Sequence, residues 1–140
     1  MLLLGSRAPG RHVEQHDFFF GIAAQLKDLI PEIKKFWPEA GNNIHVDAWR
    51  EVNAVDGYQV RVVPKEHESG SGKKLFFINL GGYQENKFEE QHYTVLTVKE
   101  DRAAAFREAS KHGSLSTRIS KVPILISMIN MELMSMIYTR

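Results

Sequence analysis

Two short segments of the chain combine histidine with carboxylates, and both have the residue types needed for acid–base or metal chemistry. They are Glu14-Gln15-His16-Asp17 and His45-Val46-Asp47-Ala48-Trp49. A histidine beside a carboxylate can act as a general base or a metal ligand, because the carboxylate orients the ring and raises its basicity. Alternate residues of a strand share a face, so we expect Glu14 and His16 to project together and Asp17 to point to the other face.

The spacing of the second segment predicts a polar binding face. His45, Asp47 and Trp49 are two residues apart, so a regular strand puts all three on one side, with Trp49 as a stacking wall for a ligand. Structural roles are the alternative for both segments. Asp47 would cap a turn while Trp49 fills the core, and each Glu-x-His would tether the loop that leads into its strand.

The first segment recurs later in the chain, which indicates an internal repeat. Leu4-Gly5 followed by Glu14-Gln15-His16 is matched by Leu80-Gly81 followed by Glu90-Gln91-His92, 76 positions further on. A repeat of this kind predicts one supersecondary unit used twice. We therefore expect equivalent environments for His16 and His92. The second copy has no counterpart of the His-x-Asp pair, so a site built on that pair exists once per chain.

Hydrophobic periodicity and turn signals predict a β-β-α-β order in each copy. Pro31 lies inside the first helix pattern and predicts a kink or a helix that restarts there. Asp56-Gly57 predicts a tight turn that returns the chain as a hairpin partner of residues 44–51, and Asp101 is a candidate N-cap. The expected elements are strands 1–4, 16–22, 44–51 and 58–63 with helix 24–37, then strands 75–80, 91–98 and 116–122 with helix 101–111.

These elements define an α+β fold with the helices packed on a mainly antiparallel or mixed sheet. We expect a single compact domain over residues 1–140, because two halves of about 70 residues would each bury too little surface alone. The internal repeat covers residues 1–64 and 75–123. A polar, Gly/Ser-rich linker joins the copies at residues 65–74.

The last segment, residues 124–138, departs from the repeat and is almost entirely apolar. It contains four of the five methionines, and both strand and helix are compatible with its pattern. An apolar segment that a small domain cannot cover on all sides is typical of a subunit interface. The sequence therefore predicts a homodimer formed through this C-terminal segment.

Composition limits the classes of partner. The 140 residues include 18 basic and 17 acidic side chains, for a net charge of +1, so neither nucleic acid nor an anionic membrane is an expected partner. With no cysteine in the chain, disulfides, thiol nucleophiles and thiolate metal sites are excluded. Without a secretory signal or a long apolar span, we expect a cytoplasmic protein.

Taken in combination, these motifs resemble domain-of-unknown-function family 1543, a group of small bacterial proteins. The resemblance is carried by Arg7-Ala8-Pro9-Gly10, Glu14-Gln15-His16-Asp17, His45-Val46-Asp47-Ala48-Trp49 and Val55-Asp56-Gly57-Tyr58, with Leu80-Gly81-Gly82-Tyr83 and Glu90-Gln91-His92 in the second copy. It covers residues 2–111 and fades after Ser116, where the family would suggest a second His-x-Asp. The resemblance implies bacterial origin and supports the fold, and it brings no established activity.

We therefore expect a non-enzymatic binding or structural protein, without a cofactor or an assigned metal site and with a small-molecule ligand of unknown identity. A small hydrolytic or metal-assisted enzyme that uses a His/carboxylate cluster is the alternative. An enzyme needs these polar groups to converge in a pocket, whereas a scaffold needs them bonded to local backbone. The candidate binding residues are Glu14, His16, Asp17, His45, Asp47, Trp49, Tyr58, Glu90 and His92.

Overall fold

The computed structural model describes residues 1–63, 72–116, 126–130 and 135–139. The chain divides into two compact units, Met1–Val52 and Asn53–Arg140. Both combine helices with antiparallel sheets, so the predicted α+β class is confirmed. The division falls before the Asp56-Gly57 turn, and the linker expected at 65–74 stays a prediction. The expected single core for the whole chain stays a prediction.

Unit 1 is built on a three-stranded sheet with the first strand in the centre. Strand β1 (Leu2–Ser6) pairs antiparallel with β2 (Gln15–Phe19) on one side and with β3 (His45–Trp49) on the other. These are three of the strands expected from the sequence, with ends shifted by up to three residues. Because both neighbours run opposite to β1, β2 and β3 run in the same direction.

The segment between β2 and β3 is helical and is interrupted as Pro31 predicts. A 3-10 turn η1 (Leu26–Leu29) leads into α1 (Ile30–Phe36), and a second 3-10 segment η2 (Pro38–Asn43) follows. Pro31 lies in the first turn of α1, where its missing backbone N–H removes no helical hydrogen bond. Of the two outcomes expected at this proline, the chain adopts the restarted helix.

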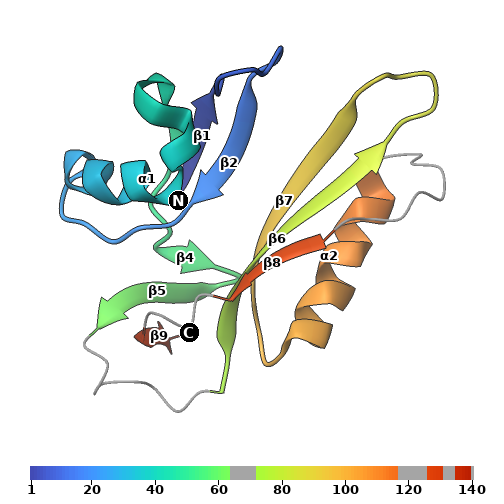
Figure 1. Cartoon of the computed structure of the whole chain (residues 1–140). Coiled ribbons are helices and arrows are strands. Elements are labelled where there is room, and N and C mark those ends of the chain that lie inside the picture. Colours follow the sequence, from blue (N-terminus) through green and yellow to red (C-terminus); the bar gives the residue numbers. More distant parts are fainter. Residues whose placement is uncertain (64–71, 117–125, 131–134, 140) are drawn as a thin grey trace. The chain divides into compact units, whose positions relative to one another are not determined.

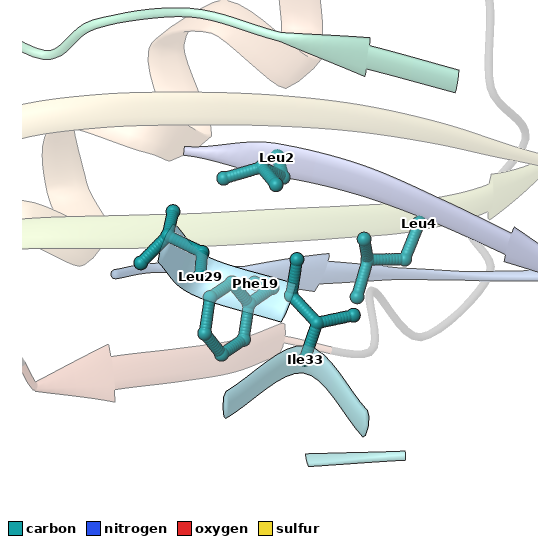
Figure 2. Packing of buried hydrophobic residues seen from close by; sticks show 5 residues of the cluster. All are labelled: Leu2, Leu4, Phe19, Leu29 and Ile33. Carbon is teal, nitrogen blue, oxygen red and sulfur yellow. The ribbon is translucent and has the colours of Figure 1, made fainter. Parts of the chain in front are cut away.

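One face of the unit 1 sheet carries the hydrophobic core. Figure 2 shows Leu2 and Leu4 of β1 and Phe19 of β2 facing two helical side chains, and the cluster consists of Leu2, Leu4, Phe19, Leu29 and Ile33. Ile30, which follows Leu29 in the chain, is half exposed and is not part of this cluster. The opposite face of β1 carries Leu3 and Gly5, and the register partners of Gly5 are His16 and His45.

Unit 2 contains a sheet with the same order of strands. Strand β6 (Lys74–Tyr83) lies between β7 (Glu90–Lys99) and β8 (Ile126–Asn130), and both pair with it antiparallel. Helix α2 (Arg102–Ser116) follows β7 (Figure 1), and its residues Ala105 and Ala109 pack against β6. The Asp101 carboxylate accepts a hydrogen bond from the Ala104 N–H at 2.7 Å, so Asp101 acts as the expected N-cap.

The structure corrects one expectation for the second half of the chain and decides between the alternatives of another. The strand expected from residue 116 is wrong at its first residue, since Ser116 ends α2, and residues 117–122 lie outside the described part of the chain. Within residues 124–138, where strand and helix were both open, β8 and a further strand β9 (Ser135–Thr139) are present. Extended backbone lets each strand pair with a neighbouring strand along one of its sides.

A second sheet in unit 2 is formed by β4 (Ala54–Val55), β5 (Tyr58–Val63) and β9, in the order β4-β5-β9. The tight turn predicted at Asp56-Gly57 joins β4 to β5, and its residues have φ of 53° and 78°. The expected hairpin partner is wrong, because β5 pairs with β4 and β9 while residues 45–49 pair with β1. By pairing with β1, residues 45–49 join a sheet that has an apolar face, whereas a hairpin with residues 58–63 would not place them there.

The turn residue Asp56 also ties β4 and β5 to strand β7. Its Oδ2 accepts hydrogen bonds from Thr97 Oγ1 at 2.6 Å and from the Val98 N–H at 3.0 Å, and Lys99 Nζ lies 3.7 Å away. Burial alone would raise the pKa of Asp56, but the two hydrogen bonds and the lysine outweigh it and lower the pKa. The ionised form of Asp56 therefore stabilises unit 2.

Replacing Asp56 with asparagine keeps the shape of the turn and removes the charge. Because its pKa is lowered by folding, the carboxylate stabilises the protein above its unfolded pKa of about 3.9, and this contribution is lost as pH falls through the folded value. At pH 7 we expect Asp56→Asn to lose about 1–2 kcal/mol of unfolding free energy, since the group is partly exposed. Urea denaturation at pH 7 and at pH 3 measures both values.

The loss of unfolding free energy in Asp56→Asn, relative to the wild type, should be smaller at pH 3, because the wild-type carboxyl is then also losing its charge. Glu85→Gln is the matched control, because it removes a carboxylate from an exposed loop position. An equal deficit at both pH values, or an unchanged midpoint at pH 7, would contradict the role given to the charge of Asp56.

Candidate functional site

Four of the candidate side chains meet on the open face of the unit 1 sheet. His45 Nε2 lies 3.1 Å from Glu14 Oε1 and 3.1 Å from Asp47 Oδ1. His16 Nε2 lies 3.3 Å from Asp47 Oδ2 and 3.8 Å from Glu14 Oε2. Each carboxylate therefore presents one oxygen to each imidazole. We call Glu14, His16, His45 and Asp47 the polar cluster.

The strand pairing explains why these residues meet. Gly5 of β1 is the register partner of both His16 on β2 and His45 on β3, so the two histidines lie on the same face on either side of Gly5. Glu14 precedes His16 by two residues and reaches the same face. Sequence spacing predicted the pairing of Glu14 with His16, whereas their meeting with His45 depends on both strands lying beside β1.

A register shift in β3 brings Asp47 to the cluster. Leu4 pairs with Val46 while Leu3 pairs with Ala48, so Asp47 is an extra residue that bulges out of the ladder. A β-bulge of this kind redirects a side chain locally. It also reverses the alternation beyond it, because Trp49 becomes the partner of Leu2, a core residue. The expected shared face of His45, Asp47 and Trp49 therefore extends only to His45 and Asp47.

Gly5 makes room for the cluster, and it was not among the candidates chosen from the sequence. A Cβ atom at this position would lie 2.5 Å from Asp47 Oδ2 and 2.6 Å from His45 Nε2. The φ of Gly5 is not positive, so the need for glycine is one of space and not of backbone conformation. The signal that could have identified it is the Leu-Gly pair that recurs with each Glu-Gln-His.

Hydrogen bonding constrains the protonation of His45. Its Nδ1 lies 3.2 Å from the carbonyl oxygen of Asn43, which can only accept, so this ring nitrogen carries the proton. A neutral ring would then direct the lone pair of Nε2 at two carboxylate oxygens, each 3.1 Å away. A positive charge among these groups, either on the ring or on a bound cation, removes that repulsion.

The cluster is open to water. The side chains of Glu14, His16 and His45 are 44–47% exposed, and that of Asp47 is 30% exposed. With both rings neutral, the two carboxylates give the cluster a formal charge of −2. Such an exposed acidic site is accessible to a dissolved ligand.

Asp17 and Tyr58 are candidates that make other contacts. Asp17 is the partner of Leu4, on the face opposite to Gly5, and its Oδ1 accepts a hydrogen bond from the Phe18 N–H at 2.7 Å. Tyr58 belongs to unit 2, where its hydroxyl accepts a hydrogen bond from Lys73 Nζ at 2.7 Å. That hydrogen bond is the first cause of the raised pKa of Lys73.

The remaining candidates, Glu90 and His92, form a smaller group beside Gly81 in unit 2. His92 Nε2 lies 3.6 Å from Glu90 Oε2, and His92 Nδ1 lies 3.3 Å from Asn79 Oδ1. Gly81 is the partner of His92, and a Cβ there would lie 2.7 Å from Glu90 Oε1. His92 and His16 thus share an exposed setting beside a glycine and a glutamate, but only His16 also meets an aspartate.

The described residues contain no group of three or more histidine, aspartate or glutamate side chains that could hold a metal ion. No helix in the part of the chain that is described has the length and apolar character to cross a membrane. The polar cluster is therefore a set of mutually paired side chains and not a preformed coordination sphere.

These observations define a small α+β protein with an exposed His/carboxylate cluster on one sheet. Residues 11–62 match the family model described as Domain of Unknown Function (DUF1543), which confirms the family resemblance over this segment of the chain. The matched segment contains all four residues of the polar cluster.

Comparison with solved structures supports the fold. The chain is similar to "a protein Il1583 from Idiomarina loihiensis", with a TM-score of 0.64 and 22% sequence identity over 92% of this chain and 83% of that chain. At this identity the likeness concerns the fold alone. Among curated proteins, no match was found.

Gly5→Ala should rearrange the polar cluster while leaving the stability of the fold nearly unchanged. The added Cβ would collide with the ends of two partly exposed side chains, which can rotate toward water. We expect the unfolding free energy to change by less than about 1 kcal/mol, while the imidazole ¹⁵N shifts of His16 and His45 change in long-range NMR spectra.

Gly81→Ala is the matched control for Gly5→Ala. It should displace Glu90 and alter only the signals of His92. Unaltered imidazole signals in Gly5→Ala would mean that the cluster does not depend on the space above this glycine.

Proposed function

We propose that this chain is a non-enzymatic binding protein whose ligand carries a positive charge and binds at the polar cluster. The observation that carries the proposal is the surroundings of His45 Nε2. Its ring proton is engaged by a carbonyl on the other side, and two carboxylate oxygens lie 3.1 Å away. A cation placed among these groups would satisfy both carboxylates and the ring nitrogen together.

Electrostatics supports a cation over an anion or a neutral ligand. Glu14 and Asp47 both direct oxygens into the cluster, whereas none of its ion pairs with the described residues involves a lysine or an arginine. A unit charge 4 Å from one carboxylate gains about 1 kcal/mol in water and about 4 kcal/mol near a protein surface. Two converging carboxylates double that attraction, and the exposed setting keeps it toward the lower value.

Exposure also favours binding over catalysis. Acid–base catalysis gains from a site that excludes water and shifts pKa values, whereas the cluster side chains are 30–47% exposed. We therefore place the hydrolytic or metal-assisted enzyme second.

A thermal-shift panel tests cation binding directly. The panel contains methylammonium, guanidinium, calcium, manganese and zinc salts, with sodium chloride at matched ionic strength. We expect at least one of these cations to raise the melting temperature of the wild type, because binding to the native state stabilises it by mass action. The same cation should not stabilise the double variant Glu14→Gln/Asp47→Asn.

Glu90→Gln is the control, because it neutralises the repeated glutamate in unit 2 and should respond like the wild type. If no cation in the panel raised the melting temperature, or if the double variant responded like the wild type, the proposed function would be overturned.

We also propose that the two sheets are copies of one unit. Each central strand, β1 or β6, is paired antiparallel with one strand on either side. The register pair of Gly5 with His16 in unit 1 corresponds to the pair of Gly81 with His92 in unit 2. The two cores support the same correspondence. Leu2, Leu4, Phe19, Leu29 and Ile33 are followed, 76 positions later in every case, by Ile78, Leu80, Val95, Ala105 and Ala109.

A bacterial origin is proposed on the basis of the family resemblance, the cytoplasm is the proposed setting, and the proposed assembly is a homodimer through residues 124–138. Strands β8 and β9 are outer members of their sheets, and an outer strand presents backbone groups to a second molecule. Sedimentation velocity of the intact chain should show a concentration-dependent dimer. A monomer at high micromolar concentration would contradict the dimer.

A further inference from the structure

We propose that the ligand of the polar cluster is a guanidinium group, and that it binds in exchange for the proton on His45 Nε2. This inference rests on the proposed function and deepens it by naming a chemical class and a form of regulation. It concerns unit 1 alone, because the side chains of the cluster belong to β2, to β3 or to the residue before β2.

The contacts of the cluster form a closed cycle in which imidazoles and carboxylates alternate. Glu14 directs Oε1 to His45 and Oε2 to His16. Asp47 likewise directs Oδ1 to His45 and Oδ2 to His16. Because the Nδ1 proton of His45 faces the Asn43 carbonyl, its Nε2 donates to the carboxylates only when the ring is charged. The cycle therefore closes when His45 is protonated and opens when it is neutral.

In the open state the cluster has more hydrogen-bond acceptors than donors. The four oxygens of Glu14 and Asp47 accept, and so does the lone pair of His45 Nε2. A guanidinium group carries five N–H donors in a planar fork and no acceptor, and it pairs with a carboxylate through two parallel hydrogen bonds. An alkylammonium ion has three donors and would leave part of this set unsatisfied. The match of donors to acceptors favours guanidinium.

A single metal ion fits the arrangement less well. The described residues contain no group of three or more histidine, aspartate or glutamate side chains that could hold one. The oxygens of each carboxylate instead point to two different nitrogens, on the two strands that flank β1. Acceptors spread in this way suit a ligand with several N–H groups rather than a point charge.

Gly5 leaves room for a flat ligand between the two imidazoles. Its register partners are His16 on one side and His45 on the other. A Cβ atom at Gly5 would lie within 2.6 Å of Asp47 Oδ2 and His45 Nε2, so any larger residue would fill this space. The cluster side chains are 30–47% exposed, which lets a ligand approach from water.

The groups around His45 set the direction of the pH dependence. Glu14 and Asp47 each face its Nε2 at 3.1 Å, and the Asn43 carbonyl faces its Nδ1. His16 contacts the same two carboxylates from β2, and β1 contains no titratable residue. A proton on Nε2 and a guanidinium group use the same oxygens, so acid weakens ligand binding, and the bound ligand releases that proton to solvent.

Unit 2 lacks the pair of carboxylates that the exchange requires. His92 Nε2 lies 3.6 Å from Glu90, its Nδ1 lies 3.3 Å from the amide oxygen of Asn79, and β8 contains neither histidine nor carboxylate. We therefore expect one site per chain, with His92 as an internal reference that does not respond to the ligand.

Isothermal titration of the full-length protein with methylguanidinium chloride tests the ligand and the exchange. We expect one ligand per chain, with affinity lower by about tenfold or more at pH 5 than at pH 8, since a free imidazole titrates near pH 6.5. Titrations at pH 6 in buffers of different ionisation enthalpy should show proton release. A parallel titration with N-acetylarginine amide identifies the source, because tighter binding of this compound indicates an arginine side chain and tighter binding of methylguanidinium a free compound.

Imidazole ¹⁵N NMR at pH 6 follows the rings directly. Methylguanidinium should convert His45 to the neutral form that carries its proton on Nδ1, and should leave the signals of His92 unchanged. His45→Gln should lose the pH dependence of binding, whereas the matched control His92→Gln should keep it. Circular dichroism checks that both variants are folded.

The outcomes separate this inference from the proposed function. Binding of methylammonium or a metal ion at the cluster in preference to methylguanidinium would overturn the guanidinium assignment and leave the proposed function standing. Equal affinity for methylguanidinium at pH 5 and pH 8, or a His45 ring that stays protonated in the complex, would overturn the exchange. A folded protein to which no cation binds would overturn both proposals.

Discussion

Unit 1 depends on the antiparallel pairing of β1 with β2 and β3 at once. Because residues of a strand alternate between its two faces, this pairing builds the core and the polar cluster together. Leu2 and Leu4 meet the helical segment on one side, while Gly5 lies between His16 and His45 on the other. The hydrophobic face fixes the strands in register, and that register fixes the distance between the two histidines.

The two sheets differ in the strand that pairs with the second side of the central strand, β3 in one and β8 in the other. Both central strands carry a glycine opposite a Glu-x-His, so this part of the arrangement is present twice. Only β3 adds His45 and a bulged Asp47, while β8 has the sequence ISMIN. The chemical difference between the units therefore arises from one strand, placed on a framework that is otherwise similar.

The sequence predicted features that depend on neighbouring residues. The restart of the helix at Pro31, the turn at Asp56-Gly57 and the cap at Asp101 each follow from local backbone chemistry. Pairing between distant strands has no such local signal, so the partner of residues 58–63 was misassigned and the meeting of Glu14 with His45 was not foreseen. The bulge at Asp47 depends on the register with β1, which is why strict alternation misplaced Trp49.

The contact between Asp56 and β7 also bears on solubility. β7 is an outer strand, and the backbone of an outer strand can recruit a strand from another molecule. By accepting the hydrogen bond of the Val98 N–H, the Asp56 carboxylate occupies one of the donors through which such recruitment would begin. A turn residue thus covers one donor of this strand edge, and it accepts that hydrogen bond most strongly while it is ionised.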